Sequence, residues 1–233
     1  MIAPIRNSAE VRGISRLCHF TSSRNLAHIL SDPRGLVNAQ QLATDDHSIF
    51  NPTDRHRFDG HEGYVCCSIE YPNAWYLRTV HRSENTFLDW VVLFIRPCHL
   101  WESGTKFCCT NASRQNGTLI KQGPAAFEEL FALKVTGQRV FHRTANHPEF
   151  LPTDEQAEVL IPGCIPLGDI IGVAVRDSKQ ARSEVAALSL LKLEIPPIVI
   201  ATELFDPNTL DDILKSGRRP NEQEYAEGAK NGS

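Results

Sequence analysis

The apolar runs of this sequence are short, and this feature limits the possible folds most. The longest runs, at 91–95 (VVLFI) and 195–201 (IPPIVIA), are far below the ~20 residues that a membrane-spanning helix needs. Runs of 4 to 8 apolar residues bounded by turn residues are typical of buried strands. The first 13 residues also lack the apolar core of a signal peptide. We therefore expect short strands in a cytoplasmic protein.

Strand-like and helix-like segments alternate along the chain without a regular order. An irregular alternation favours an α+β fold over a doubly wound parallel sheet. Apolar, β-prone runs predict strands at 14–22, 64–71, 90–97, 170–175 and within 191–205. Helical spacing and capping residues predict helices at 22–32, 72–82, 124–133, 178–191 and 207–217.

Two long polar segments interrupt this pattern. Residues 38–63 and 136–156 are rich in turn-forming residues and show no sustained periodicity, so both are interpreted as loops. Loops of this length in compact domains often serve function. With 233 residues, the chain is predicted to form one domain over 1–217, followed by a solvated, mobile tail at 218–233.

Charge and cysteine usage exclude several classes of function. A net charge of −4 argues against a protein that coats nucleic acid, although a local basic groove remains open. Seven cysteines, an odd number, indicate reduced and mostly buried thiols. No C-x-x-C or H-E-x-x-H spacing occurs, so no metal site is predicted. The G-x-S-x-G, Walker and G-x-G-x-x-G signatures are also missing.

Three residues remain as candidates for chemistry. Glu158 stands inside the apolar run AEVLI, His19 lies near the end of a predicted strand, and Arg57 lies in the polar segment DRHRFDG. Each also has a structural interpretation: Glu158 on the wet face of an edge strand, His19 as a hydrogen-bonded core histidine, and Arg57 in a loop salt bridge. Residue types alone leave both interpretations open.

Four blocks of sequence resemble the DarT family, toxins that attach ADP-ribose from NAD+ to DNA bases. The blocks occur in the family's order and cover most of residues 14–166: they are LCHFTSSRNLAHIL, DRHRFDGHEGYVCCSIEYPNAWYLR, WVVLFIRPCHLWESGTKFCCTNAS and LPTDEQAEVLIPGCIP. The pair RFDG and SIEYPN is closer to the branch that modifies guanosine than to the branch that modifies thymidine.

The resemblance implies an ADP-ribosyltransferase fold, in which two small antiparallel sheets form an NAD-binding cleft with helices around it. By motif position, it implies that Glu158 is the catalytic glutamate and Arg57 the catalytic arginine, with Arg55 as a rival for the latter. It assigns NAD+ binding to His19, Thr21, Asn25, Arg57 and Ser68. The loop at about 136–156 would face the acceptor, with Phe141, His142 and Arg143 contacting the nucleic acid.

Physical chemistry is consistent with these roles. Cleavage of the bond between nicotinamide and ribose builds positive charge on the sugar, as in glycoside hydrolysis. A carboxylate at Glu158 would stabilise that cation and take the proton from the attacking base. The planar guanidinium of Arg57 suits a pyrophosphate. Aromatic and cationic residues at 141–143 suit an unpaired base.

The leading hypothesis is therefore a toxin that transfers ADP-ribose from NAD+ to guanine in single-stranded DNA, within a toxin–antitoxin or phage-defence pair. An antitoxin that removes ADP-ribose from DNA, a macrodomain or similar hydrolase, is the expected partner. An RNA acceptor, a non-catalytic nucleic-acid-binding module and simple hydrolysis of NAD+ remain as alternatives.

Overall fold

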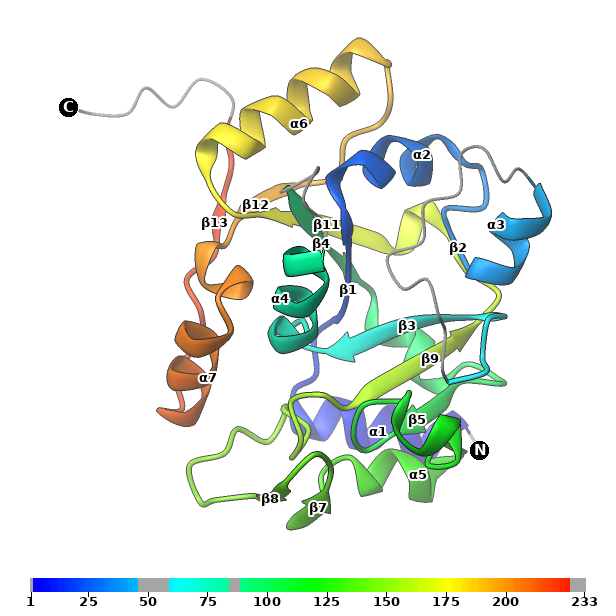
Figure 1. Ribbon diagram of the computed structural model, residues 1–233, viewed down its shortest axis with the longest axis vertical. Coiled ribbons are helices and arrows are strands. Elements are labelled where there is room, and N and C mark those ends of the chain that lie inside the picture. Colours follow the sequence, from blue (N-terminus) through cyan, green and yellow to red (C-terminus); the bar gives the residue numbers. More distant parts are fainter. Residues whose placement is uncertain (1, 46–58, 84–88, 227–233) are drawn as a thin grey trace.

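A nine-stranded sheet forms the centre of the molecule (Figure 1). The computed structural model describes residues 2–45, 59–83 and 89–226. The strands follow the order β13-β12-β11-β4-β1-β3-β9-β5-β6, and every neighbouring pair is antiparallel except β11 and β12. Their bounds are β1 (Leu17–Ser22), β3 (Tyr64–Ile69), β4 (Trp90–Ile95), β5 (Lys106–Cys108), β6 (Lys121–Gln122), β9 (Glu158–Pro162), β11 (Ile170–Val175), β12 (Ile198–Ile200) and β13 (Gln223–Glu224).

A weak seam between β1 and β3 divides this sheet into two halves. Only two residue pairs join the strands, Leu17 with Ile69 and Cys18 with Ser68, whereas β1 matches β4 over six pairs. Beyond Cys18 the two strands diverge, and the rest of β3 pairs with β9 instead (Figure 1). The α+β class is confirmed, but the expectation of two small sheets was wrong. One large sheet is present, with the seam in its middle.

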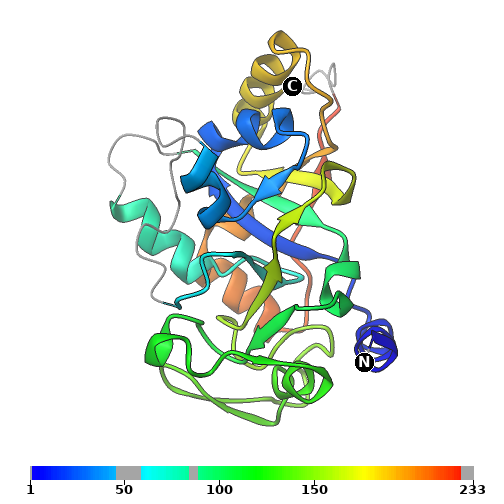
Figure 2. The same cartoon turned by 90° about the vertical axis from the view of Figure 1, so that its right-hand side faces the viewer.

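Several helices, among them α4 and α6, begin where the sequence supplies a capping side chain. Asn73 Oδ1 accepts from Tyr76 N before α4, and Asp177 Oδ1 accepts from Gln180 N before α6. Figure 2 shows α6 at one end of the molecule and the segment 105–155 at the other. The bounds are α1 (Ile2–Arg12), α2 (Leu26–Ser31), α3 (Ala39–Asp45), α4 (Ala74–Ser83), α5 (Pro124–Glu129), α6 (Ser178–Leu190) and α7 (Pro207–Lys215).

Short elements complete the described fold. Two separate strand pairs are formed by β2 (Leu36–Val37) with β10 (Cys164–Ile165), and by β7 (Lys134–Thr136) with β8 (Val140–His142). The 3-10 helices are η1 (Ser23–Asn25), η2 (Pro97–Trp101), η3 (Arg114–Gly117), η4 (Leu167–Asp169) and η5 (Thr202–Phe205). No helix in the described ranges is both long enough and apolar enough to cross a bilayer.

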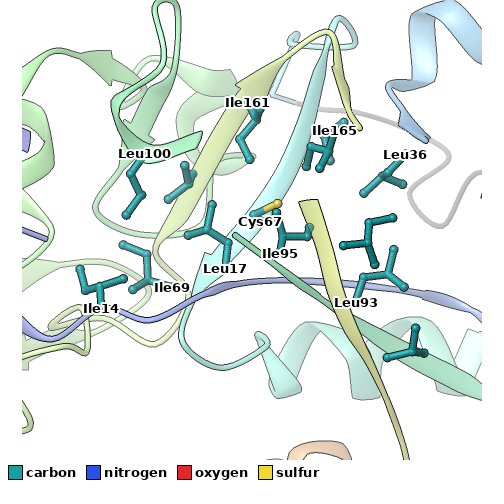
Figure 3. Packing of buried hydrophobic residues seen from close by; sticks show 14 of the residues in the cluster. Ile14, Leu17, Leu36, Cys67, Ile69, Leu93, Ile95, Leu100, Ile161 and Ile165 are labelled. Atoms are coloured by element: carbon teal, nitrogen blue, oxygen red, sulfur yellow. The ribbon is translucent and has the colours of Figure 1, made fainter. Parts of the chain in front are cut away.

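The main core lies on one face of the sheet and extends across the seam (Figure 3). Leu17, Ile95 and Ile161 come from three different strands, and each is fully buried. Strand β4 is buried along its whole length, which explains why its sequence is continuously apolar rather than alternating. On the opposite face, a smaller apolar cluster that includes Cys108 and Leu160 lies next to Glu158, the first residue of β9.

Three segments differ from the expectations of the sequence. Helix α1 forms in a region with no predicted element, and α3 occupies part of the predicted loop 38–63. A solvated tail was expected from residue 218, yet β13 pairs with β12 in the described part of that segment. There Arg16 Nη1 donates to Glu222 Oε2 at 2.7 Å, and Arg219 lies over Phe150. Residues 218–226 therefore contribute to the fold.

Candidate functional site

Glu158 opens β9, and a backbone amide holds its carboxylate. Its Oε1 accepts a hydrogen bond from Ala112 N at 3.1 Å, and its side chain is half-buried. Because side chains alternate along a strand, Val159 and Ile161 enter the main core while Glu158 faces the other side of the sheet. The carboxylate therefore interrupts an apolar run without entering the core.

Ser68 lies beside Glu158 at the seam. The register pairs Cys67 with Val159, so the next residues, Ser68 of β3 and Glu158 of β9, lie opposite each other on one face. Ser68 also pairs with Cys18 of β1, and its side chain is buried. The structure thus brings together Ser68 and Glu158, to which the family resemblance assigned cofactor binding and catalysis.

His19, Thr21 and Asn25 form a second group, on β1 and the helix that follows. His19 Nδ1 lies 2.8 Å from Cys66 O of β3, and this contact bridges the seam. Since a carbonyl oxygen only accepts, Nδ1 carries the proton in this arrangement. Thr21 is buried, and its Oγ1 accepts from Asn25 Nδ2 at 3.0 Å. These residues lie across the seam from Ser68 and Glu158.

Arg55 and Arg57 lie outside the described residues, so their predicted roles stay predictions. The described end of the same segment begins at Asp59, which is buried and accepts from His61 N through Oδ1 at 3.2 Å. Gly117 of η3 packs closely against it, because a Cβ at this position would lie 2.3 Å from Asp59 O. The segment that continues from these arginines is therefore anchored on η3.

The hairpin β7–β8 carries the predicted contacts to the acceptor. His142 is exposed and Phe141 is half-buried, with the guanidinium of Arg139 4.8 Å from the ring centroid of Phe141. Arg143 is turned inward: it donates to Leu151 O at 2.8 Å and to Pro148 O at 2.7 Å. Burial lowers the pKa of Arg143. Its guanidinium is engaged in the loop, and contact with nucleic acid by residues 141–143 stays a prediction.

Sequence reasoning missed a buried polar pair behind this hairpin. Asp154 and Thr110 are fully buried, and burial raises the pKa of Asp154. Asp154 Oδ2 and Thr110 Oγ1 form no well-aligned hydrogen bond within the described ranges, although Thr110 is close enough to oppose part of the rise in the Asp154 pKa. A Cβ on Gly137 would lie 2.2 Å from that Asp154 oxygen and 2.5 Å from the Thr110 oxygen. The only signal in the sequence was a carboxylate four residues before Glu158.

The cysteines near Glu158 are neutral thiols. Burial raises the pKa of Cys108 to about 12, and the Glu158 carboxylate adds to the shift. The pKa of Cys67 is raised mainly by burial, then by Cys18 and Glu158. Since a thiol acts as a nucleophile only when deprotonated, these cysteines do not suit covalent catalysis. All seven cysteines are free, as the sequence indicated.

Two cavities of the described structure lie away from this group. One, of about 400 Å³, is lined by Ser15, Arg16, Tyr71 and residues 219–222. The other, of about 360 Å³, is lined by residues of α4, β4, η5 and α7 and by Arg176, which follows β11. Neither is lined by His19, Ser68 or Glu158. The site is therefore defined by the register and hydrogen bonds at the seam.

Comparisons with known proteins identify the family and the fold. A family model described as "ssDNA thymidine ADP-ribosyltransferase, DarT" matches residues 18–206. No curated protein matches the chain in sequence. The fold is similar to Thermus sp. 2.9 DarT in complex with NAD+, with a TM-score of 0.58 and 14% identity over 82% of this chain and 97% of that chain.

Two further solved structures have the same fold. Thermus sp. 2.9 DarT in complex with ADP-ribosylated ssDNA gives a TM-score of 0.59, with 14% identity over 83% of this chain and 97% of that chain. Thermosipho africanus DarTG in complex with ADP-ribose gives 0.56, with 11% identity over 82% of this chain and 51% of that chain. At these identities the likeness shows a shared fold.

Proposed function

The chain belongs to the DarT family of ssDNA ADP-ribosyltransferases, and from that membership we propose that it transfers ADP-ribose from NAD+ to guanine in single-stranded DNA, releasing nicotinamide. The observation that carries this proposal is the Glu158 carboxylate, held by Ala112 N and placed beside Ser68 at the seam of the sheet. NAD+ acts as a co-substrate. The enzyme of this proposal is cytoplasmic, which seven free thiols support.

Glu158 acts on both halves of the reaction. The bond between the ribose anomeric carbon and the nicotinamide nitrogen breaks, its electron pair leaves with nicotinamide, and positive charge develops on the sugar. A fixed carboxylate stabilises that charge more than it stabilises neutral ribose. A nitrogen of the base then bonds to the same carbon, and its proton passes to the Glu158 carboxylate. The amide of Ala112 keeps the carboxylate oriented throughout.

The remaining site residues bind NAD+ around this carboxylate. The Ser68 hydroxyl, next to Glu158 in the register, suits a ribose hydroxyl of the nicotinamide half. His19 and Thr21, bridged to β3 and to Asn25, suit the other end of the dinucleotide. Arg57 binds the pyrophosphate in this proposal, with Arg55 as its rival. This division places one group of residues on each side of the seam.

The choice of guanine rests on the segments RFDG and SIEYPN, whereas the matching family is described by thymidine. A panel of single-stranded oligonucleotides, each lacking one base, incubated with NAD+ and analysed by mass spectrometry separates the two. We expect a gain of one ADP-ribose unit on every oligonucleotide that contains guanine and none on the guanine-free one. Modification that follows thymine instead would refute the base assignment and leave the transferase intact.

The same assay tests the other classes of function. Equal modification of matched RNA oligonucleotides would replace DNA by RNA as the acceptor. Nicotinamide release without any modified strand would identify hydrolysis of NAD+. Binding of the strand with neither product, unchanged in Glu158→Gln, would identify a non-catalytic module. Transfer and hydrolysis are read from the spectra, and binding of the strand needs a separate binding measurement.

The proposal includes a toxic role and a cognate antitoxin that removes ADP-ribose from DNA, a macrodomain or similar hydrolase. A modified base blocks copying of the strand, so production of an active enzyme should arrest growth. Induced expression in a bacterial host tests this: the wild-type chain should arrest growth, and Glu158→Gln should not. Arrest of equal strength by both proteins would contradict a toxicity that depends on transfer.

A further inference from the structure

A cluster of metal-binding residue types lies just beyond the end of β4 at Ile95. Cys98, His99 and Asp169 each offer one ligand atom, and these atoms all lie within 4.8 Å of one another. Cys98 and His99 belong to η2, which follows β4, while Asp169 ends η4, which precedes β11. The antiparallel pairing of β4 with β11 brings these two short helices together, and Arg96 N donates to Asp169 O at 2.9 Å.

The imidazole of His99 is the central observation. Its side chain is 1% exposed, and neither ring nitrogen has a hydrogen-bond partner in the described part of the chain. Nevertheless, Nε2 lies 3.2 Å from Asp169 Oδ2, and Nδ1 lies 3.0 Å from Glu102 Oε2. Two carboxylates therefore approach the ring closely without the alignment of a hydrogen bond. A buried polar group without a satisfied bond needs an explanation.

A shared ion explains this off-axis approach. In a tetrahedral zinc site, bonds of ~2.0 Å place neighbouring nitrogen and oxygen ligands ~3.3 Å apart, with the oxygen well off the axis of the nitrogen lone pair. The 3.2 Å separation of His99 Nε2 and Asp169 Oδ2 fits that edge of a tetrahedron. Arg96 Nε approaches the other oxygen of Asp169, Oδ1, at 3.4 Å. Asp169 Oδ2 is thus directed to the imidazole.

We propose that Cys98 Sγ, His99 Nε2 and Asp169 Oδ2 bind a divalent transition metal ion of the zinc type. A thiolate with an imidazole and a carboxylate favours Zn²⁺ over Mg²⁺ or Ca²⁺, which prefer oxygen ligands. Glu102 Oε2, 3.0 Å from His99 Nδ1, is the outer carboxylate of this proposal: a small rotation of its side chain when the ion binds lets it accept the Nδ1 proton and orient the ring. The half-buried Cys98 and Asp169 leave the ion a path from solvent.

The expected role of this ion is structural. It joins the end of β4 to the start of β11, where Ile95 pairs with Ile170. Ile95 also pairs with Leu17, whereas the part of β1 from His19 onward pairs with residues 90–93 at the other end of β4. The ion therefore stabilises the junction of β4 and β11, and the proposal does not depend on the transferase reaction.

Cobalt substitution tests the site directly. The full chain, stripped with a chelator, is titrated with Co²⁺ and followed by its thiolate-to-cobalt charge-transfer absorption. We expect one equivalent to bind, with the absorption lost in Cys98→Ser and retained in Cys164→Ser, a half-buried thiol outside the cluster. Zn²⁺ should displace the Co²⁺. Glu102→Gln should weaken binding about 10–100-fold while keeping the spectrum.

Thermal unfolding supplies a second measurement. Added Zn²⁺ should raise the midpoint temperature of unfolding of the wild-type chain and of the Cys164→Ser variant, but not that of the Cys98→Ser variant. The alternative is that a proton on His99, and no metal ion, lies between the two carboxylates. In that case the stripped chain binds no Co²⁺. That result would overturn the proposal. So would a charge-transfer absorption that survives in Cys98→Ser.

Discussion

Replacing Glu158 by glutamine removes one negative charge and almost nothing else. The amide of glutamine keeps an oxygen that can accept from Ala112 N, the bond that holds Glu158 Oε1 at 3.1 Å. The register with Cys108 and the packing of Val159 are unaffected. We therefore expect the free energy of unfolding to change by no more than about 1 kcal/mol, the difference between a charged and a neutral acceptor.

The catalytic effect follows from the burial of the carboxylate. Two unit charges ~4 Å apart interact by ~1 kcal/mol in water and by ~4 kcal/mol at the effective dielectric constant of a protein surface. Glu158 is half-buried beneath the segment that contains Ala112, so the larger value is the closer one. A loss of roughly 3–4 kcal/mol corresponds to a rate lower by about 10²–10³-fold. NAD+ binding should weaken far less, because the cation forms only in the transition state.

Single-turnover transfer to a labelled oligonucleotide measures this rate, and calorimetry measures NAD+ affinity. Glu203→Gln is the matched control: Glu203 is also half-buried and accepts from a backbone amide, Asn221 N, but it lies in η5. The control should keep the wild-type rate. A Glu158→Gln enzyme within about 5-fold of wild type, folded and saturated with NAD+, would refute the electrostatic role.

Three further predictions concern stability. Gly137→Ala places a Cβ 2.2 Å from Asp154 Oδ2, so urea denaturation should show a loss of about 1–3 kcal/mol, and an unchanged midpoint would contradict the packing. Deletion of residues 218–233 removes Glu222, the ion-pair partner of the part-buried Arg16, and should lower the free energy of unfolding by roughly 3 kcal/mol. If the segment were a mobile tail, the deletion would leave the free energy of unfolding unchanged. Burial raises the pKa of Glu155 from 4.5 to about 7, and the nearby Asp211 and Asp154 add to the shift. The folded state therefore favours the protonated carboxyl group, and the stability of the wild-type chain falls as pH rises through 7. Glu155→Gln should therefore match wild type below pH 4.5 and exceed it above pH 7, and a difference that is the same at pH 4 and pH 8 would refute this sign.

Elements that carry a clear sequence pattern of their own were predicted correctly. The run at β4 and the capped, periodic segment at α6 both form where the sequence indicated. Helix α1 was missed because only scattered apolar residues such as Ile5 and Ala9 mark its buried face. The tail was misjudged because its polar composition hides the pairing of β13 with β12 and the ion pair of Glu222. Such contacts depend on partners far away in the sequence.

The candidate site likewise combines residues that the sequence indicated with contacts that only the structure shows. Resemblance indicated Glu158 and Ser68 as separate residues, and only the register of β3 with β9 shows that they are neighbours. Arg143 is a residue type that suits contact with nucleic acid. Its guanidinium instead donates a hydrogen bond to the carbonyl of Leu151, eight residues further along the chain. The cluster around His99 joins segments about seventy residues apart, so no short spacing motif could reveal it.

A crystal structure of the chain with a non-hydrolysable NAD+ analogue tests the central claim most directly. We expect the dinucleotide to lie across the seam between β1 and β3, with a Glu158 carboxylate oxygen within about 4 Å of the anomeric carbon of the nicotinamide ribose. An analogue bound elsewhere, or bound at the seam with that carboxylate pointing into bulk solvent, would contradict it.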